Sequence, residues 1–76
     1  MRFDQRLAVF LMGELKKNND REIHFTHEQI AKYTGSAREV VTRMLKYFST
    51  EGIVSLSRGT ITVLDAGHLK KLAESD

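Results

Sequence analysis

Two arginines and a glutamate form the group of side chains in this chain that is best suited to chemistry. Arg38 and Glu39 are adjacent, and Arg43 follows four positions after Glu39. A guanidinium group can donate two hydrogen bonds to O6 and N7 of a guanine, and a carboxylate can accept one from N4 of a cytosine. Arg38, Glu39 and Arg43 are therefore the predicted base-reading residues of a site for double-stranded DNA.

A helix expected over residues 37–48 would place these side chains on one face. At about 100° per residue, Arg38, Thr42, Lys46, Glu39 and Arg43 occupy one arc of this helix. The opposite, apolar arc is a predicted core stripe, made of Ala37, Val40, Val41, Met44, Leu45 and Phe48. Any amphipathic surface helix has such a division. The chemistry of the polar arc favours a recognition helix in the major groove, with its first turn at the base edges.

Residues that can hold DNA phosphates lie within this helix and before and after it in the sequence. Hydroxyl groups, lysines and arginines make most such contacts, which position a protein without reading the base sequence. Arg58 could equally be a solvated turn residue, and Glu39 could cap the helix or pair with Arg43. The predicted DNA-backbone contacts are Thr26, Ser36, Thr42, Lys46, Ser57, Arg58 and Thr60.

Turn and cap residues indicate the elements around the recognition helix. Thr26 with Gln29, and Ser36 with Glu39, each have the spacing of a capping box, and Gly35 between them suits a left-handed turn. Two β-branched runs enclose Arg58-Gly59, which predicts a hairpin. Asp65 is expected to cap a last helix. The remaining predictions are an amphipathic helix over 3–17, a strand over 22–25, a helix ending at Thr34, and strands over 53–57 and 60–64.

This order of elements predicts a winged helix-turn-helix, an α+β fold in which a helical bundle carries a small antiparallel sheet and a β-hairpin wing. Ala31 is small where the two helices should cross, Gly35 lies in the turn, and Val41 follows in the core. Gly13 lies inside the first helix, where we expect it to permit close packing. We expect residues 1–76 to form a single winged-helix domain.

The sequence also resembles a known family. Residues 25–31, the stretch Ser36-Ala37-Arg38-Glu39-Val40-Val41-Thr42-Arg43, and residues 51–54 resemble the DNA-binding domain of the Crp/Fnr transcription regulators. GntR-type winged helices also have recognition helices rich in Arg and Glu, but the opening Phe3-Asp4-Gln5-Arg6-Leu7-Ala8 favours Crp/Fnr. The resemblance extends from about residue 2 to residue 73.

The resemblance implies a bacterial, cytoplasmic, homodimeric regulator that binds a palindromic site with half-sites similar to TGTGA. It implies that Arg38, Glu39 and Arg43 read bases, and that RNA polymerase is a partner. Ala37 and Val40 replace hydroxyl residues found near phosphates in many members, and the loop over residues 17–21 is short for a polymerase contact. Family members also carry a sensor domain, so we expect a C-terminal fragment that is monomeric alone. We expect no cofactor in this domain, and the sequence does not identify the effector.

Composition excludes several other functions. The chain of 76 residues has no cysteine, so it has no disulfide or cysteine nucleophile, and no apolar run is long enough to span a membrane. The sequence contains no nucleophile–base arrangement of the kind that would indicate an enzyme. His24, His27 and His68 make only a weak metal-site pattern. A winged helix that binds another protein remains the alternative, because the net charge of +2 is modest.

Overall fold

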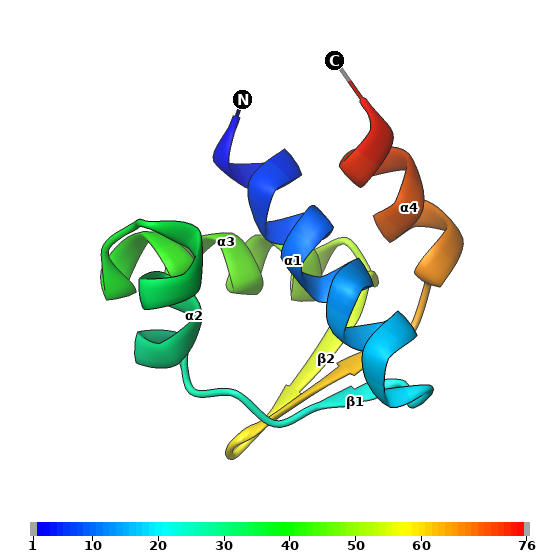
Figure 1. The fold of residues 1–76 in the computed structure, drawn as a ribbon, viewed down its shortest axis with the longest axis horizontal. Helices are drawn as coiled ribbons and strands as arrows, with labels where there is room; N and C mark the ends of the chain where they lie inside the picture. The colour runs from blue at the N-terminus through cyan, green and yellow to red at the C-terminus, as the bar shows by residue number, and fades with distance from the viewer. Residues whose placement is uncertain (1, 76) are drawn as a thin grey trace.

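Four helices and a three-stranded antiparallel sheet make up the computed structural model, which describes residues 2–75 (Figure 1). Their order along the chain confirms the predicted winged helix-turn-helix. No helix within 2–75 is long and apolar enough to cross a membrane. The elements are α1 (Phe3–Asn18), β1 (Glu22–Ile23), α2 (His27–Thr34), α3 (Arg38–Thr50), β2 (Val54–Ser57), β3 (Thr60–Val63) and α4 (Ala66–Glu74).

The core lies where the helices meet the inner face of the sheet. α1 contributes Leu7 and Leu11, and α4 contributes Leu69, all fully buried. α1 packs most extensively against α4, and Figure 1 shows these two helices side by side, with α4 on the opposite side of the molecule from the hairpin tip. The α1–α4 pair is joined to the rest of the domain by the contacts of α1 with α2 and with β1.

The sheet has the strand order β1-β3-β2, so that the hairpin strand β3 is central. Ser57 pairs with Thr60, which confirms Arg58-Gly59 as a two-residue turn, with Gly59 at a positive φ of 72°. β1 is shorter than predicted and ends at Ile23, which pairs with Ile61. The next residue of β3 in this register would be Thr60, the first residue after the turn, and β1 does not pair with it.

The helix pair has the geometry that the capping residues predicted at its start. The Thr26 hydroxyl oxygen accepts a hydrogen bond from the Gln29 backbone N–H, and the Gln29 side chain accepts one from the Thr26 N–H. The pair of bonds confirms this capping box. Gly35 ends α2 at a φ of 68°, a left-handed conformation that turns the chain towards α3.

The second predicted capping box, between Ser36 and Glu39, is wrong. Ala37, not Ser36, is the N-cap of α3, and it makes no side-chain capping bond. The Ser36 backbone N–H instead bonds to the Ala31 carbonyl and completes the closing turn of α2. Because this turn uses Ser36, α3 starts one residue later than the capping pattern indicated. It ends at Thr50, two residues beyond the predicted recognition stretch 37–48 and where the sequence predicted the helix to end.

Two further packing predictions are wrong. Only Val41, Leu45 and Phe48 of the predicted core stripe of α3 are buried, with Met44 half-buried, whereas Ala37 and Val40 are exposed. Core neighbours cover a narrower strip of α3 than its apolar arc, so the first turn stays open to solvent. Gly13 has no neighbour within 4 Å of the position that a Cβ would take, so close packing does not explain it.

Candidate nucleic-acid interface

α3 presents its polar side chains on one outward face. Arg38, Glu39, Arg43 and Lys46 are exposed and Thr42 is half-buried. These five side chains line one shallow hollow on the surface of α3. Three cations and one carboxylate give this face a formal charge of +2. The structure therefore brings together all of the predicted base-reading residues and two of the predicted backbone contacts.

Glu39 and Arg43 have no side-chain partners within residues 2–75. The ion pairs there join Arg2 to Asp4 and His24 to Glu22, so the ion pair considered for Glu39 and Arg43 is not formed. The capping bond considered for Glu39 is also absent, because α3 starts at a different residue. The hydrogen-bonding groups of this face are consequently available to a ligand.

The other predicted backbone contacts lie in three places on the structure. Thr26 is at the start of α2; its hydroxyl oxygen accepts a hydrogen bond from Gln29, which leaves the hydroxyl proton free to donate. Ser57, Arg58 and Thr60 lie at the hairpin tip, where Ser57 and Arg58 are exposed. Ser36 lies apart from both, in the turn between α2 and α3, and is half-buried.

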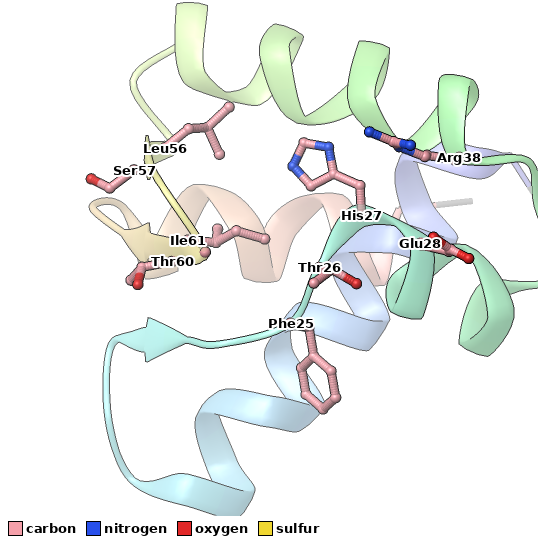
Figure 2. A pocket seen from close by; sticks show the side chains of 10 residues that line it. Phe25, Thr26, His27, Glu28, Arg38, Leu56, Ser57, Thr60 and Ile61 are labelled. Atoms are coloured by element: carbon pink, nitrogen blue, oxygen red, sulfur yellow. The ribbon is translucent and has the colours of Figure 1, made fainter.

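A cleft of about 360 Å³ separates the start of α2 from the hairpin. Figure 2 shows Thr26, His27 and Glu28 on one side, Arg38 above them, and Leu56, Ser57, Thr60 and Ile61 opposite. We call this opening the wing cleft. It connects the two groups of predicted backbone contacts, since Thr26 lies on one wall and the hairpin tip on the other.

His27 is a polar residue of this region whose role the sequence analysis missed. Its Nδ1 lies 2.8 Å from Oγ1 of Thr42, so the two side chains form a hydrogen bond between α2 and α3. Burial, and then the positive charge of Arg38, lower the pKa of His27 below its ordinary value. A residue fifteen positions from its partner gives no local sequence signal; only the crossing of the two helices brings them together.

His24 and His27 have separate partners rather than a shared ligand. His24 Nδ1 lies 3.3 Å from Thr60 Oγ1, on the hairpin, whereas His27 contacts Thr42. The described chain, 2–75, contains no cluster of three His, Cys, Asp or Glu residues that could hold a metal ion. The contacts of these two histidines lie instead at the two edges of the wing cleft.

The exposed face of α3 and the wing cleft lie in a part of the chain that matches a known protein domain. Residues 5–72 match the Crp-like helix-turn-helix domain. This chain belongs to the Crp/Fnr family. The match agrees with the DNA-binding role that the chemistry of α3 predicted, and family membership favours this role over the protein-binding alternative.

Relatives of this Crp/Fnr domain include two regulators of Thermus thermophilus. The chain is 32% identical to the Cyclic AMP receptor protein over 68 residues, which cover 90% of this chain and 32% of the relative. It is 42% identical to the transcriptional regulator SdrP over 50 residues, which cover 66% of this chain and 25% of the relative. The Crp/Fnr domain thus spans about a third or less of the length of these relatives.

Solved structures of the family share the fold closely. A Crp/Fnr-family regulator from Eubacterium rectale matches with a TM-score of 0.95 at 50% identity, covering 97% of this chain and 34% of that one. The Thermus thermophilus Catabolite Activator Protein matches with a TM-score of 0.87 at 31% identity, covering 92% of this chain and 33% of that one. Both similarities include the α2–α3 pair and the hairpin of the Crp/Fnr domain.

Proposed function

We propose that the domain binds one half of a palindromic DNA site, with α3 in the major groove. Arg38 and Arg43 each donate to a guanine, and Glu39 accepts from a cytosine. The observation that carries this proposal is the exposed face of α3, whose arginines and glutamate make no ion pairs with each other or elsewhere in residues 2–75. Side chains already bonded to one another would have to break those bonds before reading bases.

Phosphate contacts on both sides of α3 would hold the helix in register. In this proposal Thr26 donates its free hydroxyl proton to one DNA phosphate. Ser57, Arg58 and Thr60 of the hairpin contact phosphates of another part of the DNA backbone. Ser36, Thr42 and Lys46 complete the set of backbone contacts. Because these groups lie on both sides of the recognition helix, together they would fix its depth and angle in the groove.

A titration with short duplexes, followed through backbone amide chemical shifts, tests the proposal. We expect a duplex with a TGTGA-type half-site to shift residues 36–46 and 57–60 at low salt, and the shifts to fade as salt rises, since bound phosphates release counterions. A Lys70→Ala variant serves as a control that removes one positive charge from α4 rather than from α3. Its pattern of chemical-shift changes should be the same as that of the wild type. Absence of shifts with any duplex at low salt would refute DNA binding by this chain.

We extend the proposal to the assembly of the complete regulator. A palindromic site requires two domains related by two-fold symmetry, so the full-length protein would be a homodimer, in the cytoplasm, with RNA polymerase as a partner. The domain alone, with one half-site contact, should bind weakly. Sedimentation of the full-length regulator with and without a palindromic duplex distinguishes a dimer from two independent monomers.

A further inference from the structure

The hydrogen bond between His27 and Thr42 connects a titratable group to the DNA-facing surface of α3. Thr42 lies among the exposed polar residues of that surface, and His27 lies at the first position of α2, half-buried at the edge of the wing cleft. Figure 2 shows the His27 ring extending from α2 towards α3, beside Arg38. A change in the protonation of His27 therefore reaches Thr42 through a single contact of 2.8 Å.

The direction of this hydrogen bond depends on the protonation of His27. When a neutral imidazole carries its proton on Nε2, Nδ1 accepts, and the Thr42 hydroxyl must use its only proton to donate to the ring. An imidazolium has protons on both nitrogens, so Nδ1 donates and the Thr42 oxygen accepts. The Thr42 proton is then free to donate to an acceptor on DNA, such as a phosphate oxygen or a base edge.

Burial and the positive charge of Arg38 favour the neutral ring of His27 in the free protein. Arg38 of α3 and Glu28 of α2 line the same cleft, whereas the residues of β2 and β3 that line it carry no charge. His24 lies at the far edge, against Thr60. Burial and the charge of Arg38 lower the pKa of His27, which keeps the ring neutral near pH 7. DNA would reverse this balance, because an acceptor that takes the Thr42 proton leaves the Thr42 oxygen to accept a hydrogen bond from the charged ring, which favours the charged form.

We propose that His27 is a positioning residue that takes up a proton when DNA binds and thereby turns Thr42 into a hydrogen-bond donor towards the DNA. This inference rests on the proposed DNA binding by α3. DNA affinity then increases as pH falls, because at pH values near the two pKa values of His27 the complex binds a larger fraction of a proton than the free protein does. The coupling acts through the Thr42 hydroxyl, so that His27 and Thr42 form one functional unit.

Affinity as a function of pH, at constant salt, tests this coupling. The probes are a duplex with a TGTGA-type half-site and a scrambled duplex, both at low salt. We expect the affinity of the wild-type chain to rise by about threefold or more between about pH 7.5 and about pH 5.5, which corresponds to a pKa increase of about half a unit on binding. His27→Gln, which cannot titrate, and Thr42→Val, which lacks the hydroxyl, should each lose this rise.

Two histidine variants serve as controls. His68→Gln on α4 should keep the full pH dependence, and His24→Gln measures the contribution of the other histidine near the hairpin. A rise in affinity that persists in His27→Gln or in Thr42→Val would overturn the inference. So would a flat profile in the wild type, which is the result expected if the neutral ring already carries its proton on Nδ1.

Ring chemical shifts of His27 provide a measurement that needs no variant. The pKa of His27 should be higher in the DNA complex than in the free chain, and an equal or lower pKa in the complex contradicts the proposal. Failure to bind either duplex at any pH would refute the proposed DNA binding itself. Binding without movement of the His27 pKa would refute only the proton coupling, so the two failures are distinguishable.

Discussion

Arg38 and Arg58 are both exposed arginines on the proposed DNA-binding side, but their positions predict different roles. Arg38 begins α3, where a side chain can reach base edges, and Arg58 forms the hairpin tip. The sequence alone predicted both residues and the shared face of α3. It could not show that Glu39 makes no capping bond, because that depends on where α3 starts.

Replacement of Arg38 by alanine should reduce specificity at one base pair. We expect Arg38→Ala to weaken binding to the matching duplex by about 1–3 kcal/mol and to abolish discrimination at a single guanine. Competition binding with duplexes altered one base pair at a time measures both effects. Equal weakening on every sequence would instead make Arg38 a phosphate contact.

Arg58→Ala provides the contrast to Arg38→Ala. Loss of a phosphate contact weakens binding on all sequences alike and reduces the slope of log affinity against log salt by about one. Measurement of this slope for both variants separates the two roles. An unchanged slope in Arg58→Ala would identify Arg58 as a solvated turn residue.

The lowered pKa of His27 has a consequence for the stability of the chain without DNA. The ordinary pKa of histidine, 6.5, describes the unfolded chain, and the folded value lies below it. As pH falls below about 6.5, the unfolded chain binds the proton first, so the free energy of unfolding decreases until pH passes the folded pKa. Urea unfolding of wild type and His27→Gln between about pH 5 and about pH 8 should show a steeper decrease in the wild type. Equal pH dependence in both proteins would contradict this assignment.

At the scale of elements, a glycine inside a helix and a glycine at the end of a helix should respond in opposite ways to replacement by alanine. Gly13 lies within α1 with open space where a Cβ would be, so Gly13→Ala should stabilise the fold by about 0.5–1 kcal/mol. Gly35 has a φ of 68°, so Gly35→Ala should destabilise it by about 1–2 kcal/mol. Urea unfolding measures both changes, and destabilisation by Gly13→Ala would mean that α1 is more crowded at this position than the structure shows.

The elements of this fold could be predicted where a local signal fixes them. The Thr26 capping box, the Arg58-Gly59 turn and the Asp65 cap each involve residues within a few positions of one another, and all three are observed. The start of α3 could not be predicted, since Ser36 suits both a cap of α3 and the closing turn of α2. The structure adopts the closing turn, in which the Ser36 N–H donates to the Ala31 carbonyl.

The burial of residues on α3 and the hydrogen bond to His27 could not be predicted from local signals either, because both depend on residues distant in the sequence. Periodicity divides α3 into a polar and an apolar half, but only three-dimensional neighbours decide which apolar residues are covered. Val40, at 36% exposure, and Tyr47, at 53%, stay open beside Arg43. The contact between His27 and Thr42 similarly requires the crossing of α2 over α3. Sequence reasoning therefore predicted the chemistry of the face but neither its limits nor its connection to His27.

At the scale of the whole molecule, the DNA-binding face depends on packing far from it. Leu69 of α4 is fully buried in the shared core, and α4 packs chiefly against α1. Leu69→Ala should reduce the free energy of unfolding by about 2–5 kcal/mol and should weaken DNA binding by lowering the folded population. Leu69→Met keeps most of the volume and should cost less than about 1.5 kcal/mol. Urea unfolding measures both, and equal stability of Leu69→Ala and wild type would show that α4 is not needed for the fold.

The pairing of α1 with α4 also bears on how the chain is made in the cell. Within this domain α1 is synthesised before the other elements, and Leu69 is added only after α2, α3 and the hairpin. Until then Leu7 and Leu11 lack the helix that covers them, and an exposed apolar surface of this kind favours aggregation during synthesis. The domain should therefore remain unable to bind DNA until α4 has left the exit tunnel, even though the whole of α3 emerges earlier.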